Sequence, residues 1–299
     1  MNIISASRRT DIPAFYMPWL MNRLRAGSVS YPNPFNGQVY SVSLRPEDVH
    51  SIVFWSKHYG PLLPHLAELT ERGYRFYGHY TITGAPRLLE PHTPVWPAAV
   101  EVFRTLAART SPGHVQWRFD PIVFTPDLDA AFYLDRFRTI AAALAGATRR
   151  CYFSFATFYG KVKARLQRAG IEYLDPPLEE KQALVRMMAD VAAEYGMTLY
   201  ACCQEALATG RVQPAHCVDG DLLAELFPDR PPVSQLKPTR VGCGCMASRD
   251  IGVYDTCPFG CLYCYANQDH PTALSRYRAH RPAGELLSDE AGVARQAAS

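Results

Sequence analysis

The 299-residue sequence contains no run of about 18 apolar residues, and its first residues, MNIISASRRTDIP, include no basic region followed by an apolar block. We therefore expect neither a membrane span nor a secretion signal. The net charge is only +3, from 31 basic and 28 acidic residues. Such a weak balance does not favour a nucleic-acid partner. We also find no glycine-rich phosphate loop, nucleophile elbow or low-complexity tract.

Cysteine, in contrast, is abundant and unevenly distributed. Of the nine cysteines, eight follow residue 200. An odd number of cysteines without a secretion signal makes a disulfide framework the weaker interpretation. We therefore expect metal or iron–sulfur ligation in a reducing cytoplasm.

The rest of the chain alternates between two hydrophobic patterns. Runs typical of strands occur at 2–7, 51–56, 75–83, 115–124, 151–157 and 198–203, and a seventh strand is expected at 251–255. Amphipathic helices are predicted at 13–26, 60–72, 97–109, 129–145, 160–169 and 178–195. This alternation predicts an α/β fold with a parallel sheet, closed or partly closed as a TIM-like barrel. Each strand ends in polar residues, which predicts a polar cavity at one mouth of the barrel.

The segment Cys257-Pro258-Phe259-Gly260-Cys261-Leu262-Tyr263-Cys264 carries the strongest signal for function. Its three cysteines can ligate three irons of a [4Fe–4S] cluster and leave the fourth iron open. Tyr263 can lie against such a cluster and limit solvent access. The alternatives are a zinc site, which usually takes paired C-x2-C units and four ligands, or unligated thiols.

The same segment, CPFGCLYC, resembles the C-x3-C-x-aromatic-C signature of the radical S-adenosylmethionine superfamily. The resemblance implies a partial barrel in which S-adenosylmethionine chelates the open iron and is cleaved reductively to a 5′-deoxyadenosyl radical. It also implies an electron donor such as flavodoxin or ferredoxin. In that superfamily the motif usually follows the first strand, whereas here it lies near the C-terminus. We therefore expect a circular permutation that places strand 251–255 beside strand 2–7 and brings the three cysteines near Asp11.

A wider resemblance covers most of the chain. The motifs SRRTDIP (7–13), FWSKH (54–58), RFDPI (118–122), CGC (243–245) and DIGVYDTCPFGCLYCYA (250–266) are similar to a bacterial family described only as a domain of unknown function. FWSK and DPI are also distantly similar to the spore photoproduct lyase and DNA-repair-photolyase-like branch. We expect one barrel domain over 1–266, with a cysteine-rich closing segment at 202–266. The C-terminal extension at 267–299 is expected to end in disorder.

A second cysteine set could hold another [4Fe–4S] cluster, without an open iron. Its expected ligands are Cys203, Cys217, Cys243 and Cys245. Cys202 and Cys203 should point to opposite faces of a strand, so only one of the two is expected to ligate, and Cys203 is nearer the strand end. A structural zinc, or cysteines packed as small core residues, are the alternatives.

Polar residues at the strand ends are the expected cofactor contacts. After the first strand, Asp11 or Thr10 could bind the cofactor's amino group and Arg8 or Arg9 its carboxylate. Alternatively, Thr10 or Asp11 could only cap the next helix. Lys57 follows the apolar IVFW and is expected to be partly buried and paired.

Two further polar residues lie on the fourth strand. Arg118 and Asp120 could contact the cofactor or substrate, or could form a buried ion pair. No residue is identifiable as catalytic, and the substrate is unknown. The alternative functions are a non-catalytic iron–sulfur protein for electron transfer or sensing, and a nucleic-acid lesion-repair enzyme.

Overall fold

A fully parallel eight-stranded sheet forms the centre of the computed structural model, which describes residues 1–288. The strand order is β10-β1-β4-β5-β6-β7-β8-β9, so the last strand in the chain lies at one edge, beside the first. The strands are β1 (Asn2–Ala6), β4 (Val49–Ser56), β5 (Phe76–Thr81), β6 (Val115–Ile122), β7 (Arg150–Phe155), β8 (Thr198–Ala201), β9 (Gln213–Pro214) and β10 (Arg249–Asp250). The α/β class and the parallel sheet are thus as predicted, whereas closure into a barrel stays a prediction.

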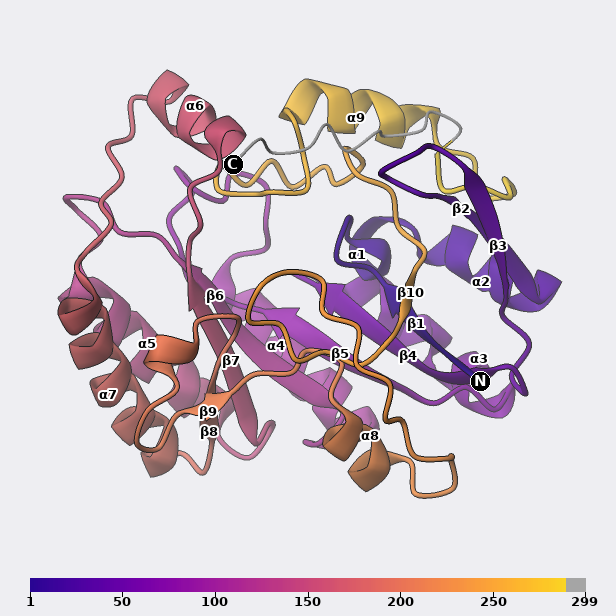
Figure 1. The fold of residues 1–299 in the computed structure, drawn as a ribbon, viewed down its shortest axis with the longest axis horizontal. Coiled ribbons are helices and arrows are strands. Elements are labelled where there is room, and N and C mark those ends of the chain that lie inside the picture. The colour runs from indigo at the N-terminus through magenta and orange to yellow at the C-terminus, as the bar shows by residue number, and fades with distance from the viewer. Residues whose placement is uncertain (289–299) are drawn as a thin grey trace.

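Helices connect the strands, as parallel pairing requires (Figure 1). They are α1 (Ile12–Phe15), α2 (Met17–Ala26), α3 (Leu66–Glu71), α4 (Trp96–Arg109), α5 (Ala130–Leu144), α6 (Gly160–Arg168), α7 (Leu178–Glu194), α8 (Gly220–Leu226) and α9 (His270–Ala279), with 3-10 helices at Gly60–His65 and Glu205–Leu207. An antiparallel hairpin of β2 (Ser28–Pro32) and β3 (Val39–Ser43) branches off after α2. No helix within residues 1–288 is long and apolar enough to cross a membrane.

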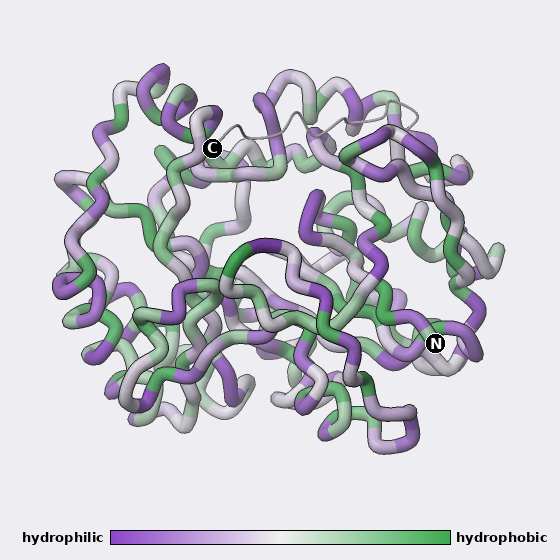
Figure 2. The backbone as a smooth tube through the Cα atoms, viewed as in Figure 1, coloured by the Kyte–Doolittle hydropathy of each residue, from purple (hydrophilic) through white to green (hydrophobic). Residues whose placement is uncertain are grey.

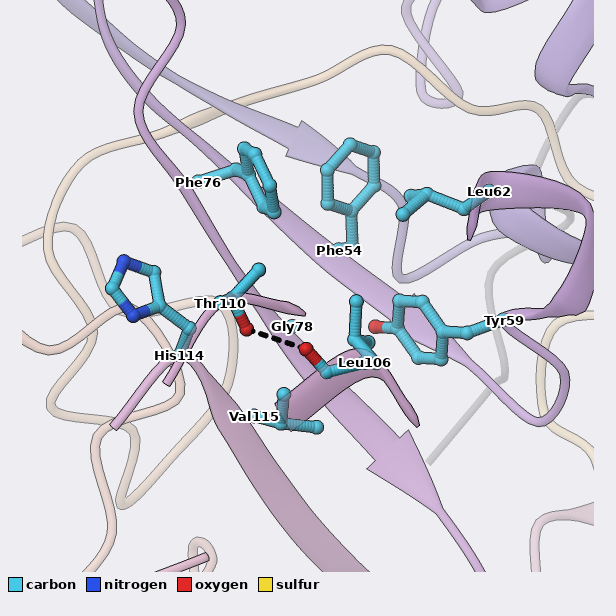
Figure 3. Close-up of a pocket in the computed structure, with 9 residues that line it drawn as sticks. All are labelled: Phe54, Tyr59, Leu62, Phe76, Gly78, Leu106, Thr110, His114 and Val115. Carbon is cyan, nitrogen blue, oxygen red and sulfur yellow. Dashed lines mark hydrogen bonds between the residues drawn. The ribbon is translucent and has the colours of Figure 1, made fainter. Parts of the chain in front are cut away.

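The two faces of the sheet bury different kinds of residues. Ile4, Phe54 and Phe119 belong to the large apolar core beneath the helices. This core is closely packed: around Gly78, the gap lined by aromatic and aliphatic side chains has no room for a water molecule (Figure 3). Hydrophobic residues also run through the central strands, while the outer helices alternate in hydropathy along the chain (Figure 2).

The other face of the sheet is partly polar and is covered by the chain that follows β8. Ile3, Val53, Tyr77 and Tyr152 on this face pack with Cys202, Cys217, Cys243, Cys245 and the apolar residues of α8. In Figure 1 this segment, coloured orange, crosses in front of the strands. The cysteine-rich segment therefore covers this face of the sheet, whereas the polar cavity at the mouth of a barrel stays a prediction.

Residues 267–288 pack onto the rest of the molecule. Asp269 caps α9 by accepting a hydrogen bond from Thr272 N at 2.8 Å. Beyond α9, Trp19 Nε1 donates to the carbonyl of Gly284 at 3.1 Å, and Leu287 is buried. The disorder predicted for the chain end falls on 289–299, outside the described residues.

Candidate functional site

Strand β10 places the start of the cysteine segment at the C-terminal edge of the sheet. It pairs in parallel with β1, with Ser5 opposite Asp250. The Asp250 carboxylate accepts hydrogen bonds from the hydroxyls of Ser5 and Ser7, both at 2.6 Å, and from Arg8 N at 2.9 Å. The predicted neighbour of the first strand is correct, although the pairing involves Arg249 and Asp250 rather than 251–255.

The three cysteines after β10 lie in a compact loop. Cys261 is buried, whereas Cys257 and Cys264 are half-buried. Cys264 N donates to Cys261 O at 3.1 Å, and Ala266 N donates to Cys264 Sγ at 3.3 Å. Asn267 Nδ2 closes the loop on Cys257 O at 2.7 Å. These bonds bring the ends of the motif together, and the charges of Cys261 and Cys264 both affect the pKa of Cys257, so the three thiols lie near one another.

Arg165, on α6, holds this loop from outside. Its buried guanidinium donates to Leu262 O at 3.0 Å, to Asn267 O at 2.5 Å and to Cys264 O. This role was not predicted, because Arg165 lies on an amphipathic helix nearly 100 residues upstream. A single side chain thereby fixes both the middle and the end of the cysteine loop.

Lys57 and Tyr263 meet at a buried carboxylate, Glu90, in the loop that follows β5. Glu90 Oε1 accepts from Lys57 Nζ at 2.9 Å, from Thr83 Oγ1 at 2.5 Å and from the Tyr263 hydroxyl. Burial raises the pKa of Glu90, but the Lys57 charge and the hydrogen bonds outweigh it, so the pKa is lowered. Burial likewise lowers the pKa of Lys57, yet Glu90 and Cys261 leave it raised. The pair is therefore charged, and its cation lies close enough to Cys261 to stabilise a thiolate there.

Asp11 caps α1 and also ties that helix to the end of β4. Its carboxylate accepts from Ala14 N at 3.0 Å, from Ser56 Oγ at 2.7 Å and from Lys57 N at 2.8 Å. Burial raises the pKa of Asp11 to about 6 against these hydrogen bonds. Burial also raises the pKa of Cys257, and the charge of Asp11 adds to this effect. Asp11 thus lies near the cysteine loop as predicted, and the helix-capping interpretation of its carboxylate is confirmed.

Thr10 and Arg8, which precede Asp11 in the sequence, have different surroundings. Thr10 Oγ1 is buried and has no hydrogen-bond partner among residues 1–288. Arg8 stacks over the Trp55 ring, with 4.7 Å between its guanidinium carbon and the ring centroid. Burial lowers the pKa of Arg8, but charges that include Cys245 and Cys217 raise it overall. Arg8 therefore faces the second cysteine set rather than the first.

Arg118 and Asp120 form the buried ion pair that was one interpretation of the sequence. Arg118 Nη2 contacts Asp120 Oδ2, and Ser154 Oγ donates to the other carboxylate oxygen. Arg118 Nη1 also donates to Cys217 Sγ at 3.1 Å. This ion pair thus reaches the second cysteine set as well.

Five thiols of that second set form a closed ring of contacts, which we call the thiol ring. The Sγ atom of Cys202 lies 3.9 Å from Sγ of Cys203 and 3.6 Å from Sγ of Cys217. Further thiol contacts join Cys203 to Cys243, Cys243 to Cys245, and Cys245 to Cys217. Cys202 and Cys203 were expected to point apart. Both join the ring because β8 ends at Ala201 and Cys203 has a φ of 54°, which interrupts the alternation of a strand.

Cationic side chains surround the thiol ring. Arg118 donates to Cys217, and Arg240 Nη2 lies 3.8 Å from Cys202 Sγ. Arg8 supplies a third guanidinium near Cys245. Within residues 1–288, no three His, Cys, Asp or Glu side chains are grouped so as to hold one metal ion. A [4Fe–4S] cube does not require such a group, because each thiolate binds a different iron atom.

The fold and these clusters define a parallel-sheet α/β protein with cysteine sites at and behind the C-terminal edge of the sheet. The model of one family, Domain of unknown function (DUF1848), matches residues 3–266. The chain belongs to this family. A search of curated proteins finds no match.

Proposed function

We propose that the protein is an iron–sulfur enzyme of the radical S-adenosylmethionine type. The observation that carries the proposal is the loop of Cys257, Cys261 and Cys264 at the C-terminal edge of a fully parallel sheet. In parallel α/β folds this edge is where active sites are built. When bound there, a [4Fe–4S] cluster with one open iron would supply an electron for cleaving S-adenosylmethionine to a 5′-deoxyadenosyl radical.

The neighbouring residues fit an anionic cluster held by these three thiolates. Burial raises the pKa of the Cys261 thiol, and the positive charge of Lys57 opposes this shift by stabilising the thiolate. Arg165 keeps the backbone of the loop in place. Thr10 Oγ1 is a buried hydroxyl still able to bond to a cofactor. Asp11, whose oxygens are engaged, would act by positioning α1 and Lys57 rather than by direct contact.

We further propose that the sheet is a circularly permuted partial barrel. The strand order supports this, because β10 occupies the edge position beside β1 although it comes last in the chain. The usual first strand of the superfamily would then be β10, followed in space by β1 and β4. All nine cysteines are free thiols, which supports a reducing compartment such as the cytoplasm and a soluble one-electron donor such as flavodoxin or ferredoxin.

A second [4Fe–4S] cluster at the thiol ring is also proposed. Four thiolates would ligate all four irons and leave none open, so this cluster would transfer electrons or stabilise the fold. Cys203, Cys217, Cys243 and Cys245 were the expected ligands, and the contacts of Cys202 make it an equal alternative to Cys203. The guanidiniums of Arg8, Arg118 and Arg240 support an anionic centre, because their charges offset that of thiolate ligands.

The decisive experiment uses anaerobically purified protein reduced with dithionite and supplied with S-adenosylmethionine. We expect formation of 5′-deoxyadenosine and about eight irons per chain, from two clusters of four. Cys257→Ala should abolish cleavage and retain the second cluster's iron. Cys151→Ala is the matched control, because Cys151 is a buried thiol in the helix-side core.

Two results would overturn parts of the proposal. Protein loaded with iron that leaves S-adenosylmethionine intact would favour electron transfer or sensing over the enzyme. Zinc in place of iron at the thiol ring would refute the second cluster.

A further inference from the structure

A cavity of about 260 Å³ lies at the end of β5, between the loop that follows this strand and helices α4 and α5. We propose that it binds a small organic anion, with a carboxylate or phosphate head and an apolar body. The inference concerns the cavity's own residues and does not depend on whether a cluster or S-adenosylmethionine is bound.

The charge of the cavity wall is the first argument. Lys57, Arg87 and Arg136 supply three cations, and Glu90 supplies one carboxylate. Glu90 is already paired with Lys57. Arg87 Nη1 donates to the carbonyls of Pro91 and Thr93, which are neutral. The lining therefore carries a net positive charge that its own acid does not neutralise.

Arg136 is the cation with the greatest unused hydrogen-bonding capacity. Its Nε is buried and has no hydrogen-bond partner within the described part of the chain. Its guanidinium lies near the rings of Phe132, at 5.4 Å, and Trp96, at 5.8 Å. A guanidinium held against aromatic rings still presents its edge for paired hydrogen bonds to a carboxylate or phosphate.

The backbone fixes the position of Arg136. Gly84 follows β5 with a φ of +63°, a conformation that side chains rarely adopt. A Cβ added to Gly84 would lie 2.4 Å from Cδ of Arg136, which means that the loop presses directly on the stem of the arginine. This close packing restricts the conformations of the Arg136 stem, and the side chain lines the cavity.

The remaining lining selects an organic ligand over a bare ion. Ile82, Val95, Trp96 and Ala99 give apolar surface, while Thr81 offers a hydroxyl. A volume near 260 Å³ exceeds what one inorganic ion would fill and approaches the range of roughly 300–1,000 Å³ for small-molecule pockets. An anionic head at Arg136 and an apolar body against Trp96 would use both parts of this lining.

The cavity also adjoins the proposed active site. Lys57 and Glu90 belong to its wall, and Glu90 accepts the hydroxyl hydrogen bond of Tyr263 in the cysteine loop. A ligand in the cavity would contact the Lys57–Glu90 pair, whose carboxylate is also bound by Tyr263. If the enzyme proposal holds, this position suits a substrate.

The test is calorimetric titration of the purified full-length chain without S-adenosylmethionine. Phenyl phosphate and benzoate serve as anionic probes, benzyl alcohol as the neutral probe and inorganic phosphate as the bare anion. We expect at least one of the aromatic anions to bind about tenfold or more tightly than benzyl alcohol and inorganic phosphate, with affinity that falls as salt is added. The stronger of the two anions identifies a phosphate or a carboxylate head.

Three variants locate the binding. Arg136→Gln should weaken it about tenfold or more, and Ala99→Leu should block it by filling the cavity while the charges stay in place. Arg138→Gln is the matched control, because Arg138 lies on the same helix, is half-exposed and pairs with Glu194. Thermal unfolding checks that each variant is folded.

The proposal is overturned if neither aromatic anion binds or if benzyl alcohol or inorganic phosphate binds equally well. It is also overturned if the folded variants Arg136→Gln and Ala99→Leu both keep full affinity for the aromatic anion. The same holds if Arg138→Gln loses as much affinity as Arg136→Gln does. Because no cofactor is present, failure here leaves the cleavage assay of the proposed enzyme unaffected.

Discussion

Replacing Arg165 with methionine should loosen the cysteine loop without unfolding the rest of the protein. Methionine keeps most of the length of the buried stem but removes every donor. The carbonyls of Leu262, Cys264 and Asn267 then lose their partner. An unsatisfied buried acceptor costs about 1–3 kcal/mol.

Water can reach part of the site in the variant, because the hydrogen bonds of Arg165 to Leu262 and Cys264 are only partly buried. We therefore expect a total loss of about 3 kcal/mol rather than the full sum over three carbonyls. Since the loop can open locally, this loss should appear in the local opening equilibrium. At about 1.4 kcal/mol for each factor of ten, the amides of the loop should exchange roughly 100-fold faster.

Hydrogen exchange of the metal-free protein, followed by mass spectrometry of peptides covering 257–267, measures this change. The amide of Leu262, which donates to Leu89 O at 3.0 Å, is a reporter of the closed loop. Arg168→Met is the control, because Arg168 is exposed on the same helix and donates to Ala164 O within it. Equal exchange in the two variants would refute the assignment of Arg165 as the residue that holds the loop.

Three further predictions concern the contacts around the site. Glu90→Gln should lower the free energy of unfolding by about 3 kcal/mol in urea titrations, because it leaves the buried Lys57 charge unpaired. Glu68→Gln, at a partly exposed carboxylate paired with Arg25 and Arg72, should cost less than about 1 kcal/mol, and equal losses would contradict the role of Glu90. For Asp11, whose pKa burial raises from 3.8 to about 6, the folded state binds the extra proton. The stability of metal-free wild type relative to Asp11→Asn should therefore fall by on the order of 3 kcal/mol between about pH 4 and pH 7, and a flat difference would exclude the shift. Asp250→Ala removes the acceptor of four hydrogen bonds from Ser5, Ser7, Arg8 and Gly252. This substitution should speed amide hydrogen exchange in β1 and in residues 249–253, measured by mass spectrometry. Asp229→Ala, which removes an exposed ion pair with Arg75, should leave that exchange unchanged.

The regular elements were predictable because each has a strong local pattern. The helix expected at 97–109 is Trp96–Arg109, and the one at 129–145 is Ala130–Leu144. Both alternate apolar and polar residues with the period of a helix that covers a sheet. α9 was missed, since it buries little apolar surface, although Asp269 followed by His270 and Pro271 is a recognisable start signal.

The position of the site was predictable, but the partners within it were not. Parallel strands bring their C-terminal ends to one edge, so Lys57 and Asp11 could be expected near the last strand. Which charges they meet depends on contacts between distant segments, such as Glu90 in a loop. Likewise, Cys203 joins the thiol ring beside Cys202 because Cys203 has a positive φ, a conformation that a cysteine in a sequence does not indicate.

The pairing of β10 with β1 has a consequence for biosynthesis. Ser5 and Asp250 are 245 residues apart in sequence. At synthesis rates of roughly 5–20 residues per second, β1 leaves the ribosome some 10–50 seconds before its neighbour is made. During that interval β1 has an unpaired edge, which is a potential site of aggregation. The cysteine loop follows all the strands of the sheet in sequence, so any cofactor held there would be inserted after those strands have been synthesised.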